Sequence, residues 1–121
     1  MSDAQEAKPF DLEERTFQFA KRVRVFVKTL PHTVSNYEDV KQLVRSSGSV
    51  GANYREANES LSKKDFILRI KISKKEAKES VYWLRLVDTG SEIKTGKERE
   101  ALIQEATELM KILGAILRKC E

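Results

Sequence analysis

The chain has 121 residues, a length that fits one domain and leaves no room for a second full-sized one. Its 40% hydrophobic and 35% charged residues, with only two prolines and five glycines, exclude the disordered and the membrane-spanning classes of protein. Lys and Arg number 23 against 19 Asp and Glu, and the resulting formal charge of +4 permits an anionic partner without requiring one.

Apolar residues recur at helical spacing along most of the chain, and no segment alternates convincingly with a period of two. We therefore expect an all-α fold, with residues 1–10 as a flexible tail. The first predicted helix covers residues 12–30 and ends at Pro31, because proline has no N–H to donate and disfavours helix in the residue before it. Its apolar face holds Leu12, Phe19, Ala20, Val23, Phe26, Val27 and Leu30.

The second predicted helix begins near Ser35 or Asn36, either of which can cap the first turn, and continues to residue 61. Its middle, residues 46–52, is rich in serine and glycine, which are poor helix formers. We interpret this stretch as helix because the apolar period keeps its phase across it, so that the small residues would let a neighbouring helix approach closely. The alternative is a loop at this position. The apolar face of this helix holds Val40, Leu43, Val44, Val50, Tyr54, Ala57 and Leu61.

The third predicted helix starts at the capping residue Ser62, runs to about residue 88 and stops at Gly90. It has two apolar sides. One side holds Phe66, Ile70, Ala77, Val81 and Leu84, and the other holds Leu68, Ile72, Trp83 and Leu86. A monomeric bundle needs one apolar side per helix, so we predict that the second side, which holds the only tryptophan, packs against another subunit.

The fourth predicted helix covers residues 97–119 and follows a linker at residues 89–96. Its apolar face holds Leu102, Ile103, Ala106, Leu109, Met110, Leu113, Ile116 and Leu117. Four helices joined by short connections predict an antiparallel up-down-up-down four-helix bundle, which forms one domain over residues 1–121.

Positive charge is concentrated in the third predicted helix, since residues 62–88 contain eight bases and four acids. A strip that spans about 80° of the helical wheel holds Lys64, Lys71, Lys75, Lys78 and Arg85, with Tyr82 inside it. We predict that this strip contacts the phosphate backbone of RNA or DNA. The alternative is a solvated face that only keeps the protein soluble. Assembly into an oligomer would repeat the strip and strengthen its binding to a single ligand.

The sequence offers no arrangement typical of an enzyme or a metal protein. A single cysteine, Cys120, excludes an intramolecular disulfide framework, and with only one histidine, His32, the usual zinc and Cys/His catalytic sites are excluded as well. We expect His32 to lie in a surface loop and Cys120 to be a packing residue or a frayed terminal thiol. Glu76 and Glu79 stand three residues apart, but no Glu-x-x-His accompanies them, and Lys75 offers Glu79 an ordinary surface ion pair. We therefore predict no catalytic residue, no metal and no cofactor.

Asn53 and Glu56 fall beside the apolar face of the second predicted helix. A polar group that another helix covers needs a hydrogen-bond partner. We therefore predict a structural hydrogen-bonding role for both residues, with direct contact to a ligand as the alternative.

No apolar run approaches the roughly 18 residues that are typical of a membrane span. Residues 1–11 have neither the basic start nor the apolar stretch of a signal peptide. We expect a cytoplasmic protein that does not associate with membranes.

Residues 42–57, 62–66 and 72–84 resemble a bacterial family of small four-helix-bundle proteins, first noticed as reading frames in the intervening sequences of 23S ribosomal RNA genes. The most specific parts are residues 49–56, with an Asn-x-x-Glu motif, and residues 75–84, with Glu-x-x-Glu-x-x-x-Trp-Leu. The resemblance implies an antiparallel bundle that associates into a ring, with a pentamer favoured. The family also includes accessory variability proteins of diversity-generating retroelements, which are basic rings that bind nucleic acid.

These observations favour a non-catalytic homo-oligomer with a weak, sequence-independent contact to RNA or DNA. The alternative is a structural or protein-binding adaptor that binds no nucleic acid. The two functions differ in their response to salt, because phosphate contacts weaken steeply as salt rises, whereas an apolar protein interface is nearly indifferent to it.

Overall fold

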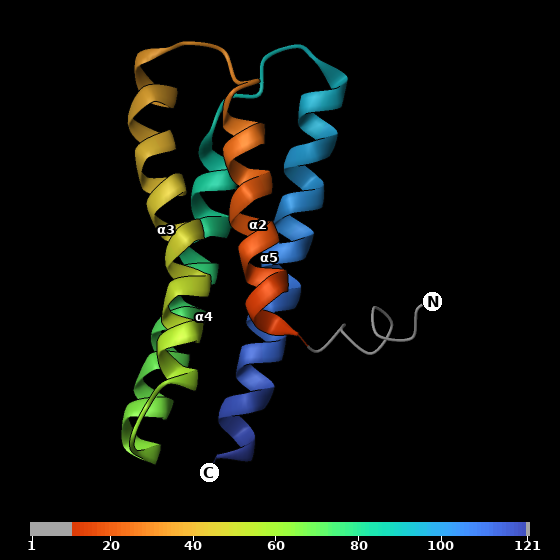
Figure 1. The fold of residues 1–121 in the computed structure, drawn as a ribbon. Helices are drawn as coiled ribbons and strands as arrows, with labels where there is room; N and C mark the ends of the chain where they lie inside the picture. Colours follow the sequence, from red (N-terminus) through yellow and green to blue (C-terminus); the bar gives the residue numbers. More distant parts are fainter. Residues whose placement is uncertain (1–10, 121) are drawn as a thin grey trace.

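The structure, a computed structural model, describes residues 11–120. Across these residues the chain forms four α-helices and no strand: α2 (Leu12–Val27), α3 (Val34–Asn58), α4 (Lys63–Leu86) and α5 (Ile93–Lys119). Consecutive helices run in opposite directions and form an up-down-up-down bundle (Figure 1). The predicted all-α four-helix bundle is therefore confirmed. The expected flexible tail at residues 1–10 lies outside the described residues.

The helices occupy the four corners of the bundle. α2 packs against α3 and α5, and α4 packs against the same two helices, so α2 and α4 lie at opposite corners. The core between them includes the fully buried side chains of Phe19, Phe26, Leu43, Ile70, Leu84, Leu102, Leu109 and Leu113. Burying an apolar side chain of this size contributes about 1.5–3 kcal/mol, so this shared core holds the four helices together.

The small residues in the middle of α3 lie inside a continuous helix, and the alternative of a loop at residues 46–52 is wrong. Ser46 is buried, and its Oγ lies 2.9 Å from Oγ of Ser80 on α4. On the next turns, Ser73 Oγ of α4 donates a hydrogen bond of 2.7 Å to the carbonyl oxygen of Val50. The small side chains thus allow α3 and α4 to approach closely and supply the hydrogen bonds that buried hydroxyl groups need.

The cap of α4 is correctly predicted and the cap of α3 is not. Ser62 accepts a hydrogen bond from the N–H of Asp65 at 3.1 Å, as expected. At the start of α3, Thr33 takes the capping role that was assigned to Ser35 or Asn36, and its Oγ1 accepts from the N–H of Asn36 at 3.1 Å.

The buried Asn36 instead connects the two loops at one end of the bundle. Its Nδ2 donates to the carbonyl oxygens of Pro31 at 3.0 Å and Asp88 at 2.9 Å. Its Oδ1 accepts from the N–H of Asp88 at 2.9 Å. One side chain therefore satisfies backbone groups of the α2–α3 and α4–α5 connections together.

The remaining helix ends differ from the predictions by two to four residues. α2 stops at Val27 because the last turn tightens, with the N–H of Thr29 bonded to the carbonyl of Phe26 three residues earlier. α3 stops at residue 58 and α5 begins at residue 93. α4 ends at Leu86, so Gly90 is not its stop: Gly90 lies farther along the loop, where its φ of +72° suits glycine.

Candidate functional site

The five cations predicted to contact nucleic acid all lie on the solvent side of α4. This basic strip consists of Lys64, Lys71, Lys75, Lys78 and Arg85, all of which are exposed, together with the exposed ring of Tyr82. None of the ion pairs formed within residues 11–120 includes one of these five cations. The basic strip therefore presents five cations along the helix that no carboxylate contacts directly within residues 11–120.

The second apolar side of α4 is only partly covered. Leu68 and Leu86 remain 53% and 51% exposed, whereas Ile72 and Trp83 are half-buried. Trp83 packs partly against the core, and the Tyr82 ring meets it edge-on with the ring centroids 4.9 Å apart. Exposed leucines at both ends of one helix side leave an apolar surface that the bundle itself does not bury.

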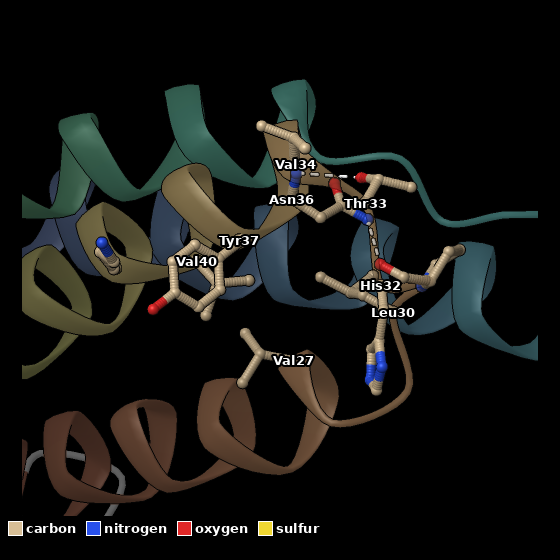
Figure 2. Close-up of a pocket in the computed structure, with 10 residues that line it drawn as sticks. Val27, Leu30, His32, Thr33, Val34, Asn36, Tyr37 and Val40 are labelled. Atoms are coloured by element: carbon tan, nitrogen blue, oxygen red, sulfur yellow. Dashed lines mark hydrogen bonds between the residues drawn. The ribbon is translucent and has the colours of Figure 1, made fainter.

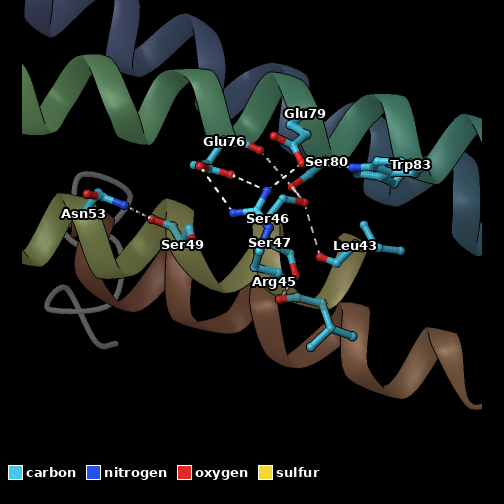
Figure 3. Close-up of polar contacts among 11 residues, drawn as sticks. Leu43, Arg45, Ser46, Ser47, Ser49, Asn53, Glu76, Glu79, Ser80 and Trp83 are labelled. Atoms are coloured by element: carbon cyan, nitrogen blue, oxygen red, sulfur yellow. Dashed lines mark hydrogen bonds and ion pairs between the residues drawn. The ribbon is translucent and has the colours of Figure 1, made fainter. Parts of the chain in front are cut away.

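A group of charges links α3 to this apolar side (Figure 3). Arg45 of α3 pairs with Glu76 at 3.2 Å and with Glu79 at 2.5 Å, both on α4. Trp83 Nε1 donates a hydrogen bond of 3.0 Å to the Glu79 oxygen that Arg45 also contacts. The surface ion pair expected between Lys75 and Glu79 is thus replaced by a contact between helices, and the Glu76 side chain is only 14% exposed.

These contacts stabilise the ionised forms of both partners. The hydrogen bond from Trp83 and then the guanidinium of Arg45 lower the pKa of Glu79 against the opposing effect of burial. In turn, the hydrogen bonds to Glu79 and Glu76 raise the pKa of Arg45 above its already high ordinary value. Arg45 and Glu79 therefore form a charged pair, and Glu76 shares the same guanidinium.

Asn53 and Glu56 lie on the same helix but in different surroundings. Asn53 is half-buried: its Nδ2 donates to the carbonyl oxygen of Ser49 at 2.9 Å, and its Oδ1 accepts from Arg69 of α4 at 3.1 Å. Glu56 is exposed, and its carboxylate forms no hydrogen bond or ion pair within the described part of the chain. The structure does not bring these two side chains together into one site.

A cavity of about 740 Å³ lies between the end of α2 and the start of α3 (Figure 2). Its walls are mainly apolar and include Val27, Leu30, Tyr37 and Val40. The polar atoms of Asn36 in this wall are already bonded to backbone groups, and His32 is exposed in the loop beside it. The cavity therefore offers shape and apolar surface without a cluster of reactive groups.

Within residues 11–120, no group of three or more His, Cys, Asp or Glu side chains is placed to hold a metal ion. Cys120 is half-buried at the end of α5. None of the helices at residues 11–120 is both long enough and apolar enough to span a membrane.

The comparison with protein families decides the classification. A family model described as 23S rRNA-intervening sequence protein matches residues 8–115, which is most of the chain. The chain belongs to this family. The match confirms the resemblance inferred from residues 42–57, 62–66 and 72–84.

One solved protein structure has the same fold as this chain. The crystal structure, at 1.70 Å resolution, is that of a protein with unknown function from the S23 ribosomal protein family of Bacteroides thetaiotaomicron. The two chains are 34% identical, with a TM-score of 0.72 over 87% of this chain and 96% of the other. No curated protein matches the chain.

The contact of Arg45 with Glu76 and Glu79 is the feature that sequence reasoning missed. The sequence shows Glu76 and Glu79 as a carboxylate pair but does not connect Arg45 with them, because Arg45 lies on another helix, 31 and 34 residues earlier. The available signal was the position of both glutamates beside the second apolar side of α4, where a charge needs a partner.

Proposed function

We propose that this protein of the 23S rRNA-intervening sequence family is a non-catalytic homo-oligomer, with a pentamer favoured, whose basic strip contacts the phosphate backbone of RNA or DNA. The observation that carries the proposal is the basic strip itself. It aligns five exposed cations on one side of α4, and none of them is neutralised by a carboxylate within residues 11–120. Cations in this state are open to the phosphates of a polyanion.

The position of the apolar side supports assembly without loss of the basic strip. On the helical wheel, the centre of the second apolar side lies about 90° from the centre of the basic strip. A second subunit that approaches from the side of Trp83 can therefore cover Leu68 and Leu86 and leave Lys71, Lys78 and Arg85 in solvent. Each added subunit then adds another basic strip, so that one nucleic acid meets several strips at once and binds more tightly.

The chemistry of the basic strip favours backbone contact over base recognition. Four of its five cations are lysines, which act as point charges and do not form the paired, planar hydrogen bonds by which arginine reads a base. Contacts of this type position a nucleic acid but carry no sequence information. The proposed binding is therefore weak for one subunit and independent of sequence.

The second candidate is an adaptor that binds a protein and no nucleic acid. The apolar cavity between α2 and α3 favours it, since it is lined by Val27, Leu30 and Val40 and lies apart from the basic strip. An apolar contact of this kind would change little with salt.

The test is RNA binding as a function of salt. The anisotropy of a fluorescent hairpin RNA is titrated with the protein, and the affinity is expected to fall about tenfold or more between 50 and 200 mM salt, because each phosphate contact releases counterions. A variant with Lys71→Glu, Lys75→Glu and Lys78→Glu is expected to lose the binding. The matched control, Lys97→Glu, Lys111→Glu and Lys119→Glu, makes the same charge change at exposed positions of α5 and is expected to retain most of it.

Two results would contradict the proposal. If the triple variant of α4 binds the RNA as well as the α5 control does, the basic strip is not the contact surface. If the wild-type protein binds no RNA even at low salt while remaining an oligomer, the adaptor is the better description.

A further inference from the structure

The side of the bundle formed by α3 and α4 is acidic as well as apolar. It combines the second apolar side of α4 with five carboxylates, and we call it the acidic face: Glu56, Glu59, Asp65, Leu68, Ile72, Glu76, Glu79, Trp83 and Leu86. At one end, Glu56, Glu59 and Asp65 line a hollow of about 280 Å³ with Leu68. Towards the other end, Glu76 and Glu79 share the single cation Arg45.

Negative charge remains on the acidic face after its internal contacts are made. Arg45 pairs with Glu76 and Glu79, and Lys75 of the basic strip lies close enough to act electrostatically on Glu79. Arg69 donates its hydrogen bond to the amide oxygen of Asn53, so five carboxylates face three cations. One oxygen of Glu76 is buried and accepts no hydrogen bond, although it lies 3.2 Å from Arg45. An apolar surface with this charge fits a partner surface that is apolar and basic.

The outward side of α2 is such a surface. Phe17 and Val25 are 53% and 65% exposed there, and Lys21, Arg24 and Lys28 are exposed around them. The spacing places these five residues on one side of the helix, and we call them the basic α2 face. The Nζ of Lys21 lies 5.6 Å from the centre of the Phe17 ring, so charge and apolar surface adjoin directly. None of the three cations joins an ion pair in the described part of the chain.

We infer that the basic α2 face of one copy packs on the acidic face of the next copy. The inference rests on the proposed homo-oligomer and identifies its two contacting surfaces. Because α2 and α4 lie at opposite corners of the bundle, one subunit can use both faces at the same time. Two different faces make a head-to-tail contact, which repeats from copy to copy and closes into a ring where the rotation permits.

The basic strip of α4 is a poorer partner for the acidic face. The basic strip has the charge that the acidic face requires, but Tyr82 is its one large exposed side chain with apolar surface. The basic α2 face offers two exposed apolar side chains, Phe17 and Val25. Packing α2 on the acidic face hides Phe17 and Val25 together with Leu68 and Leu86, all of which are more than half exposed in the single subunit. The contact also leaves in solvent the cations of the basic strip that lie farthest from the acidic face on the helical wheel, Lys71, Lys78 and Arg85.

The first test reverses the charge of each face and then of both. Lys21→Glu with Lys28→Glu changes the basic α2 face, and Glu56→Lys with Glu59→Lys, at two exposed positions, changes the acidic face. Each pair is expected to raise the concentration at which half of the oligomer dissociates by about tenfold or more, because like charges then meet across the contact. The combined fourfold variant is expected to return this concentration close to the wild-type value. Light scattering gives the masses, circular dichroism checks folding, and Lys97→Glu with Lys111→Glu on α5 is the matched control.

The second test uses the unmodified protein and does not depend on the folding of any variant. A carbodiimide joins neighbouring lysine and carboxylate side chains, and the products of a mixture of nitrogen-14 and nitrogen-15 protein are identified by mass spectrometry. We expect links between copies from Lys21 or Lys28 to Asp65, Glu76 or Glu79. Within one copy these groups lie on opposite corners of the bundle.

The outcomes separate this inference from the proposed function. A wild-type protein that is monomeric overturns the proposed oligomer and this contact together. An oligomer that keeps its mass in the Lys21→Glu, Lys28→Glu variant, with links between copies only at other positions, overturns this contact and leaves the oligomer standing. Restored mass in the fourfold variant, or links from α2 lysines to α4 carboxylates between copies, supports it.

Discussion

At the scale of single residues, Glu79 shows how two helices fix the charge of one side chain. Trp83 donates to it from the next turn of α4, and Arg45 reaches it from α3. Both contacts favour the ionised carboxylate and lower the pKa of Glu79. The tryptophan is thus held by its indole N–H as well as by its packing against the core.

The lowered pKa of Glu79 predicts a specific dependence of stability on pH. A carboxyl group whose pKa is lower in the folded than in the unfolded state stabilises the fold above its ordinary pKa of 4.5, and this contribution is lost as the pH falls through the folded-state pKa. The free energy of unfolding of the wild type should therefore exceed that of Glu79→Gln near neutral pH, and the difference should shrink as the pH falls below 4.5. Urea unfolding of both proteins at a series of pH values measures this difference.

Trp83→Phe provides the companion measurement, because it removes the contact that lowers the pKa most. A titration of the Glu79 side-chain carboxyl carbon by NMR should show a higher pKa in this variant than in the wild type. Equal pKa values in the two proteins would mean that the indole N–H does not bond to Glu79 in solution.

At the scale of helices, small residues set how closely neighbours approach. Gly51 of α3 faces Thr16 of α2, and a Cβ atom at Gly51 would lie 2.8 Å from Thr16 Oγ1. That oxygen is held in place because its hydroxyl donates to the carbonyl of Leu12 at 2.7 Å. By contrast, a Cβ atom at Gly96 of α5 would meet no atom of another helix within 4 Å.

The two glycines make a matched pair of substitutions. Alanine stabilises a helix by about 1 kcal/mol relative to glycine, and this contribution applies to both Gly51→Ala and Gly96→Ala. Gly51→Ala also crowds Thr16, and overpacking of this kind costs about 1–3 kcal/mol. We expect Gly96→Ala to be more stable than the wild type and Gly51→Ala to be less stable than Gly96→Ala by about 1–3 kcal/mol, measured by urea unfolding. Equal stabilities would show that α2 can move away from α3 at no cost.

At the scale of the whole molecule, the helices carry more apolar surface than the core of the bundle buries. One side of each helix forms the core, yet Leu68 and Leu86 lie more than half exposed on the second apolar side of α4. Basic and acidic surfaces lie on different sides of the same subunit. This division supports an assembly in which apolar and acidic surface is covered and the basic strip is left for a polyanion.

Substitutions on the second apolar side are expected to weaken the proposed oligomer. Leu68→Ala removes a side chain that is 53% exposed in the subunit, so it should lower the mass in light scattering with little loss of subunit stability. Trp83→Ala should lower the mass further, at some cost to the core against which the ring packs. Ile93→Ala on α5, also an exposed apolar position, is the control and should keep the wild-type mass. An unchanged mass in both α4 variants would exclude this side as an interface.

The sequence alone predicts those features of the fold that depend on residues only a few positions apart. The repeat of apolar residues predicted all four helices, and it remained in phase across residues 46–52, where composition alone suggested a loop. Ser62 was recognised as a cap because a capping side chain bonds to an N–H only three residues away. The second apolar side of α4 was visible for the same reason, since residues three and four apart share a helix face.

The tertiary structure decided the features that join residues far apart in the chain. Local position makes Asn36 one of two candidate caps, with Ser35 as the other, but the Asn36 side chain bonds to Asp88, 52 residues later, and Thr33 caps the helix instead. Arg45 meets Glu76 and Glu79 only because serines let α3 and α4 lie close together. Local sequence thus determined the helices and their faces, whereas the partners of individual polar side chains depend on which helices become neighbours, and packing of the whole core decides that.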